Sequence, residues 1–219
     1  MQNALIKKTA LAAVLATGTM FTTVANAVEI SGNVGMTTDY IWRGNTQASG
    51  DASLSGGLDA DLGGGLAVGT WVGSLGASSN DDANYELDLY ASYGFEVGGV
   101  GVEVGYIYYA YPGVADDGSD FEDIYVSLGY GPVSVSYYEL LDAESAATDA
   151  DEGTYLSLDY ELALPSDFTA TLHYGSEEFE NSADDEDTSI SISKDAFTFT
   201  VSDDEGDDTR AIVSYGLSF

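Results

Sequence analysis

The sequence predicts an all-β fold: a transmembrane antiparallel up-and-down β-barrel of about 12 strands that follows a cleaved signal peptide. Three observations lead to this fold class. The chain opens with an export signal, the remainder alternates between apolar and polar residues in segments of strand length, and residues 211–219 form a final alternating strand with an aromatic end.

The N-terminal segment has the three parts of a signal peptide. Lys7 and Lys8 precede an apolar stretch at residues 10–24, and residues 25–27 read Ala-Asn-Ala, the small-x-small form of a signal-peptidase site. An uncleaved anchor is the alternative, but threonine and glycine interrupt a stretch that would need about 20 apolar residues to span a membrane. We therefore expect a signal peptide at residues 1–27.

Residues 28–219 are expected to form one outer-membrane β-barrel domain. The 38 acidic residues all lie there, against Arg43, Lys194 and Arg210 as the strong bases, which excludes binding to nucleic acid backbones. With 16 Tyr, 26 Gly and 3 Pro, and 44% hydrophobic residues in alternation, the composition favours strands and turns over disorder. The absence of cysteine excludes disulfides, thiolate metal sites and lipid attachment through cysteine.

The strands follow one another with two kinds of connection. In order, they are expected at residues 28–42, 51–61, 65–76, 83–97, 100–110, 120–130, 132–140, 153–163, 167–175, 187–194, 196–203 and 208–219. Every second connection is a tight turn, as at Gly98 and Gly99, and the others are generally longer and acidic, as at residues 142–152 and 177–186. This alternation is typical of outer-membrane barrels, with turns in the periplasm and loops outside.

Each strand has one apolar and one polar face. Leu156, Leu158 and Tyr160, for example, oppose Ser157 and Asp159. In a soluble lipocalin-like barrel or sandwich, the apolar faces would have to fill the interior, whereas a membrane barrel turns them to lipid. Aromatic residues near strand ends on the apolar register are expected to form a girdle at the membrane interfaces: Tyr40, Trp42, Tyr85, Tyr93, Phe95, Tyr108, Tyr130 and Tyr137.

The final strand carries an expected assembly signal. Tyr215, Leu217 and Phe219 lie on its apolar face, and the aromatic end resembles the C-terminal strand of bacterial outer-membrane barrels. That resemblance implies recognition by the barrel assembly machinery, and the alternation implies contact with outer-membrane lipid and lipopolysaccharide. The expected location is the outer membrane of a Gram-negative bacterium.

A short motif supplies a family resemblance. Residues 38–44, Thr-Asp-Tyr-Ile-Trp-Arg-Gly, followed by Gln47, resemble the N-terminal signature of the TorF-like porin family, as does Gly-Thr-Trp at residues 69–71. The resemblance implies an outer-membrane barrel with a channel role and does not specify a substrate. The extreme acidity of this chain departs from a generic member of that family.

Polar residues on the inner register are expected to line the lumen. They are Asp39, Arg43, Asp59, Asp61, Glu86, Asp88, Glu103, Asp123, Asp159, Glu161 and His173. Carboxylates around an aqueous path favour cations, so we expect passive diffusion of small solutes with a preference for cations. The alternatives are a plugged interior, in which Arg43 neutralises Asp39 or a neighbouring acid, and a non-transporting surface barrel with acidic, cation-binding loops.

Two further chemistries, hydrolysis at His173 and calcium binding in the acidic loops, lack a supporting sequence motif. His173 could act with Ser157, Ser176 or Glu161 in a hydrolase, but no motif supports that geometry, and we expect no enzyme activity. The acidic runs at residues 149–152 and 203–208 lack the ligand spacing of a calcium loop, so solvated loops are favoured over bound calcium. No cofactor or metal site is expected.

Overall fold

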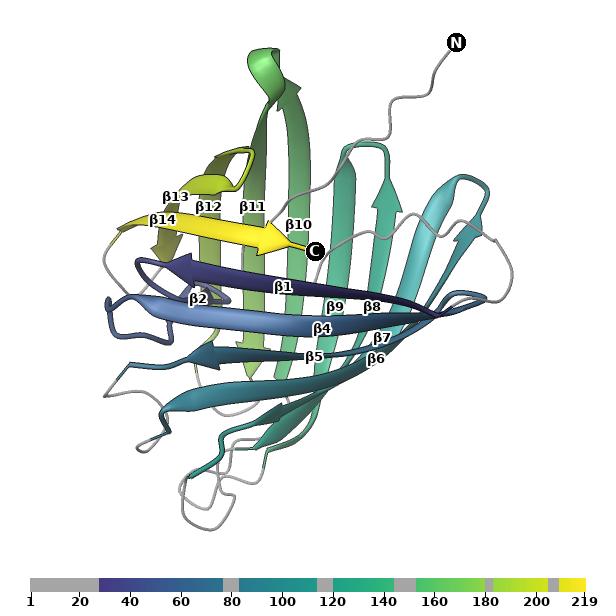
Figure 1. The fold of residues 1–219 in the computed structure, drawn as a ribbon, viewed down its shortest axis with the longest axis horizontal. Coiled ribbons are helices and arrows are strands. Elements are labelled where there is room, and N and C mark those ends of the chain that lie inside the picture. Colours follow the sequence, from purple (N-terminus) through teal and green to yellow (C-terminus); the bar gives the residue numbers. More distant parts are fainter. Residues whose placement is uncertain (1–27, 77–82, 114–119, 144–152, 180–182, 205–208) are drawn as a thin grey trace.

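The computed structural model describes residues 28–76, 83–113, 120–143, 153–179, 183–204 and 209–219 (Figure 1). Within them, twelve strands form a closed antiparallel barrel, which confirms the predicted fold class. They are β1 (Glu29–Thr37), β4 (Ser53–Gly63), β5 (Leu66–Ser74), β6 (Tyr85–Val97), β7 (Val100–Ala110), β8 (Phe121–Tyr130), β9 (Val133–Ala143), β10 (Gly153–Leu164), β11 (Phe168–Phe179), β12 (Asp185–Lys194), β13 (Phe197–Asp204) and β14 (Arg210–Ser218).

The barrel closes between its first and last strands. β1 pairs with β4 on one side and with β14 on the other, with Gly35 opposite Gly216. The backbone of Phe219 continues this pairing, because its N–H donates to Gly32 at 2.9 Å and its carbonyl accepts from Gly32 at 2.8 Å. Closure leaves no sheet edge unpaired, which is the condition for a sheet to cross lipid.

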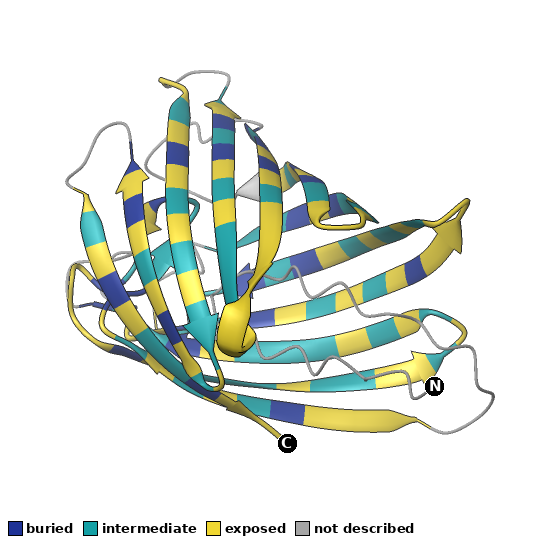
Figure 2. Cartoon of the chain, turned by 90° about the horizontal axis from the view of Figure 1, so that it is seen from above, coloured by how far each residue is buried: buried dark blue, intermediate teal, exposed yellow. Residues whose placement is uncertain are grey.

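Alternation along the strands places side chains as predicted. On β10, Leu156 and Leu158 are 45% and 44% exposed on the outer surface, while Tyr155 and Ser157 are buried on the inner one. Figure 2 shows the same banding along many of the strands. The sole helix in the described residues is the short 3-10 turn Pro165–Asp167, and no helix there is long and apolar enough to cross a membrane.

The barrel interior is filled at one end. Inward residues near the long connections are buried. Among them are Tyr109, Tyr138 and Tyr155, which belong to one cluster of buried hydrophobic side chains. Inward residues near the tight turns, such as Asp61 and Glu161, are exposed. The filled half therefore lies at the end predicted to face outside.

The first connection supplies part of this filling and differs from the prediction. β1 ends at Thr37 rather than at residue 42, and the chain turns inward to form the small hairpin of β2 (Ile41–Trp42) and β3 (Asn45–Thr46). We call residues 38–52 the inner loop. Tyr40 and Trp42 were expected in the lipid-facing girdle, and this is wrong: Tyr40 is buried inside, and Trp42 packs against Tyr109 and Phe121.

The other girdle aromatics lie on strands with their expected register. Tyr85, Tyr93, Phe95, Tyr130 and Tyr137 are exposed on the outer surface, and Tyr108 is half-buried. Strand ends differ by a few residues elsewhere, and β11 extends through Glu177, which was expected in a loop. The predicted signal peptide at residues 1–27 and most of the long acidic loops, including residues 149–152 and 205–208, lie outside the described residues.

Candidate functional site

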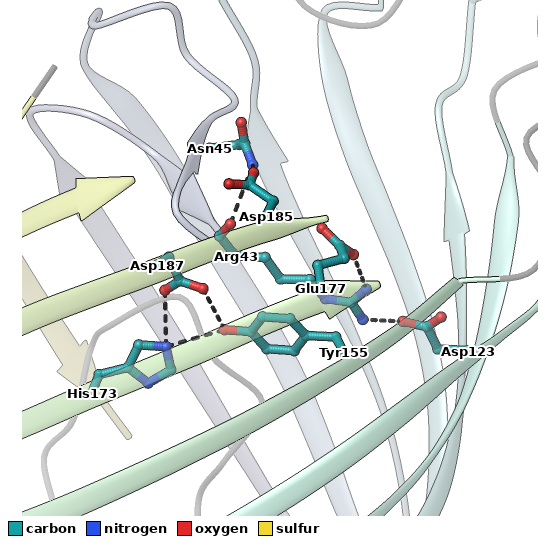
Figure 3. A network of polar contacts seen from close by, with 8 residues as sticks. All are labelled: Arg43, Asn45, Asp123, Tyr155, His173, Glu177, Asp185 and Asp187. Carbon is teal, nitrogen blue, oxygen red and sulfur yellow. Dashed lines mark hydrogen bonds and ion pairs between the residues drawn. The ribbon is translucent and has the colours of Figure 1, made fainter. Parts of the chain in front are cut away.

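The inner loop carries Arg43 at the tip of its hairpin. Arg43 and Gly44 have φ of 47° and 83°, the left-handed pair that a two-residue hairpin turn requires. A Cβ on Gly44 would collide with the side chain of Asp187 on β12. Glycine therefore lets the hairpin tip approach the barrel wall closely, and Arg43 extends from this tip (Figure 3).

The guanidinium of Arg43 joins the loop to two strands of the wall. Nη2 donates to Asp123 Oδ2 on β8 at 2.5 Å, and Nη1 donates to Glu177 Oε1 on β11 at 2.8 Å. The Arg43 and Glu177 side chains are each 9% exposed, and that of Asp123 is fully buried. Ion pairs in so dry a setting are screened little by salt, and breaking one leaves a buried charge without its partner.

Aromatic rings complete the Arg43 site. The guanidinium carbon lies 4.3 Å from the ring centroid of Trp42, 4.7 Å from that of Tyr155 and 5.2 Å from that of Tyr138, all within range of cation–π attraction. Burial alone would lower the pKa of Arg43, but the surrounding negative groups, Asp123 foremost, raise it above its ordinary value. Arg43 is a fixed positive charge in the lumen.

A second anchor holds the base of the inner loop. Asp39 accepts a hydrogen bond from Thr46 Oγ1 at 2.6 Å and pairs with Arg210 Nη1 on β14 at 3.2 Å. Of the partners considered for Arg43 in a plugged interior, Asp39 or a neighbouring acid, the structure shows neighbouring acids, Asp123 and Glu177, and Asp39 pairs with Arg210 instead. Arg43 was also expected to be the one strong base on the inner register of a strand. Instead, Arg43 lies in the loop, and Arg210 occupies an inner position on a strand.

His173 lies between two carboxylates on the wall next to the loop. Its Nδ1 contacts Asp159 at 2.7 Å, and its Nε2 contacts Asp187 at 3.0 Å and the Tyr155 hydroxyl at 3.1 Å (Figure 3 draws the Nε2 contacts). With a proton on each nitrogen, the ring can donate to both carboxylates at once. Both nitrogens thus face carboxylates, whereas a hydrolase would need one of them directed at a serine such as Ser157 or Ser176.

The remaining predicted lumen residues are spread along the barrel. Asp59 accepts from Tyr90 at 2.5 Å, Glu103 from Tyr125 at 2.7 Å, and Glu86 from Tyr40 at 3.2 Å. Asp88 is buried beside Glu86 on β6, while Asp61 and Glu161 are exposed near the tight turns. The structure therefore gathers Arg43, Asp123, Asp159 and His173 into one network and leaves the others in smaller groups.

The sequence analysis missed several members of this network. Glu177, Asp187 and Tyr155 contact Arg43 or His173, and Arg210 holds Asp39. Glu177 continues the inner register of His173 through Gly175, so extending the alternation by two steps would have found it. Alternation with Leu156 places Tyr155 on the inner face of β10, but no local signal shows its contacts with Arg43, His173 and Asp187, because these residues lie on other segments.

Together, the closed barrel, the lipid-facing apolar surface and the polar lumen define an outer-membrane porin-like β-barrel. Residues 22–205 match the profile of the family described as "Bacterial protein of unknown function (Gcw_chp)", and the chain belongs to this family. A comparison with curated protein sequences gave no match.

Solved structures share the fold at low sequence identity. The KdgM porin aligns with 88% of this chain and 98% of its own, at 11% identity and a TM-score of 0.53. The KdgM porin in complex with disordered oligogalacturonate gives 10% identity over 88% of this chain and 98% of that chain, with a TM-score of 0.54. Outer membrane phospholipase A from Escherichia coli gives 14% identity over 86% and 92%, with a TM-score of 0.46. At these identities, the KdgM likeness shows the fold alone.

Proposed function

We propose that this protein is a passive outer-membrane channel for small solutes, favouring cations, whose path is narrowed by the inner loop. The observation that carries the proposal is the insertion of Arg43 between Asp123 and Glu177 inside a closed barrel with a polar lumen. A loop that enters the barrel narrows the path through the lumen. Because ion pairs rather than covalent bonds hold this loop, it does not close the path permanently. The resemblance to the TorF-like porin family supports the same role.

The charge of the lumen supports cation preference. In the described part of the filled half, the buried acidic side chains outnumber the bases Arg43, Arg210 and His173. The buried acids are Asp39, Glu86, Asp88, Asp123, Glu177, Asp187 and Asp204. Carboxylates on a low-dielectric wall raise the local concentration of cations and repel anions. Oligogalacturonate, which the KdgM complex contains, is a polyanion, and we expect this lumen to disfavour such a solute.

The filled half of the barrel favours a second candidate function, a non-transporting barrel that acts in envelope structure or surface interaction. Ile107 and Asp123 are fully buried there, as expected of a packed plug. In that case the acidic loops, which lie largely outside the described residues, would be the functional surface and could bind divalent cations. An enzyme is not proposed, because the carboxylates flanking His173 leave no hydrolase geometry.

Conductance in planar lipid bilayers tests these candidates. We expect discrete steps and a reversal potential that favours cations in a salt gradient. Replacing inner acids with isosteric amides, in the variant D59N/D88N/E103Q/D159N, should reduce that preference. Replacing Glu139 and Glu178, which are exposed on the outer surface, with glutamine is the matched control and should change it little.

Each outcome bears on one candidate. Purified, folded protein that shows no steps would favour the non-transporting barrel. Steps whose reversal potential is the same in the inner-acid variant would contradict the acidic lumen as the source of selectivity and leave the channel standing.

The proposal includes export and assembly. Residues 1–27 would direct secretion and be removed, and the strand ending at Phe219 would be read by the barrel assembly machinery through Tyr215, Leu217 and Phe219. Leu217 and Phe219 are 47% and 76% exposed on the outer surface, where lipid and lipopolysaccharide would cover them. The proposed location is the outer membrane of a Gram-negative bacterium.

A further inference from the structure

Two acidic residues on β6 are buried, and none of the ion pairs found among the described residues includes them. Glu86 and Asp88 are 2% and 4% exposed and point into the lumen from adjacent inner positions. Glu86 accepts from the Tyr40 hydroxyl at 3.2 Å. Asp88 Oδ1 is buried, with no hydrogen-bond partner among the described residues. We call Glu86 and Asp88 the β6 acid pair.

Several other acidic side chains around the inner loop contact a basic side chain of the protein. Asp123 and Glu177 hold Arg43, Asp159 and Asp187 hold His173, and Asp39 pairs with Arg210. No base in the described part of the chain forms an ion pair with the β6 acid pair. Two carboxyl groups in contact in a dry site must share a proton or take up a cation, since two bare charges repel.

Aromatic side chains surround the β6 acid pair as they surround Arg43. Asp88 lies directly between Trp71 on β5 and Tyr109 on β7 in the strand register. Gly73, which is opposite Glu86, makes room for the Trp71 ring, because a Cβ on Gly73 would collide with it. The Trp71 ring centroid lies 5.4 Å from that of Tyr40. Carboxylates with aromatic faces also hold the guanidinium of Arg43, so the two sites share their chemistry.

We propose that Glu86 and Asp88, with Tyr40, Trp71 and Tyr109, form a binding site in the lumen for a small organic cation with a primary ammonium or guanidinium group. Such a group donates to both carboxylates and lies against the rings. A hard metal ion is less suited, because it needs about six oxygen ligands and the described residues contain no group of three or more acids or histidines able to hold one. The inference rests on the proposed channel role, since it names the solutes that the lumen would accept.

Binding can be measured without conduction. Trp42 and Trp71 are the two tryptophans of the chain, so in a W42F background the fluorescence of the folded barrel in detergent reports on Trp71. We expect methylguanidinium chloride to change this fluorescence saturably, beyond the effect of KCl at equal ionic strength. The variant W42F/E86Q/D88N should bind at least about tenfold more weakly, because charge-assisted hydrogen bonds are lost.

Controls keep the test decisive. W42F/E139Q neutralises an acid that is exposed on the outer surface of β9 and should retain the W42F response. Folding of every variant is checked by heat-modifiable migration, and W42F/E86Q and W42F/D88N replace the double variant if it does not fold. A response that KCl reproduces, or one that survives loss of the acid pair, would overturn the site. Binding in a protein that gives no conductance would support the site and contradict the channel, so the two failures are distinct.

Discussion

Arg43 of the inner loop donates to Asp123 of β8 at 2.5 Å across a separation of 80 residues in the chain. Together with the contact to Glu177, this ion pair holds the tip of the inner loop inside the barrel, while Asp39 and Arg210 hold its base. In the proposed channel, the position of the loop tip and the width of the path therefore depend on the same guanidinium.

Replacing Arg43 with alanine should destabilise the barrel and release the loop. Asp123 and Glu177 would remain buried without their partner, and loss of one member of a buried ion pair costs about 3–5 kcal/mol. We expect a lower midpoint of thermal unfolding, followed by heat-modifiable migration on gels, and larger conductance steps in bilayers.

The triple variant R43Q/D123N/E177Q is the control for charge burial. It removes all three charges and keeps hydrogen-bonding groups of similar shape, so much of the lost stability should return. Wild-type stability and conductance in R43A would show that the loop is held by other contacts.

Gly44→Ala should destabilise the packing of the hairpin against the barrel wall more than Gly50→Ala does. Both glycines have positive φ, 83° and 82°, so both variants bear the strain of a left-handed alanine. Only Gly44 lies against Asp187, whereas the nearest atom to a Cβ on Gly50 is the flexible end of Arg210 at 3.9 Å. The difference in thermal unfolding midpoint between the two variants reports the cost of the contact between residue 44 and Asp187. Equal midpoints would contradict the close approach of Gly44 to Asp187.

Tyr155→Phe should lower stability, whereas Tyr160→Phe on the same strand should not. The Tyr155 hydroxyl donates to Asp187 at 3.0 Å and contacts His173, while Tyr160 faces outward and is 39% exposed. Loss of a buried hydrogen bond to a charged group costs about 1.5–3 kcal/mol. Chemical denaturation in detergent should separate the two variants, and a neutral Tyr155→Phe would show that the His173 network is dispensable for stability.

The double variant Y215S/F219S should reach the outer membrane at reduced levels. It removes lipid-facing apolar area worth about 25 cal/mol per Å² and the packing of Tyr215 on Phe197, whose ring centroids are 4.9 Å apart. The matched control, S214A/S218A, changes the inner face of the same strand and should assemble normally. Quantitative immunoblots of membrane fractions compare them, and normal levels of Y215S/F219S would contradict the assembly signal.

The form recovered from the cell envelope should begin at Val28. Peptidase recognition of Ala25 and Ala27 depends on small side chains, so replacing both with leucine should leave the precursor uncleaved. N-terminal sequencing of the mature protein checks the first residue, and recovery of chains that still begin at Met1 would contradict cleavage.

The sequence by itself determined the barrel wall. A period of two over segments such as residues 153–163 specifies a strand and its outward face, and tight turns such as Gly98 and Gly99 specify where strands pair in antiparallel order. These signals are local, so they can be read without knowing what lies across the barrel. They placed Asp123 and His173 on the inner surface.

Only the tertiary structure decided what the lumen contains. The alternation of Tyr40 and Trp42 continues that of β1, and nothing local distinguishes a longer strand from a loop that turns inward. The choice depends on Asp123, Glu177 and Arg210, which hold Arg43 and Asp39 from distant strands. These ion pairs join residues up to 171 positions apart in the chain. The stabilisation that holds the loop in the lumen therefore arises only once the barrel has closed.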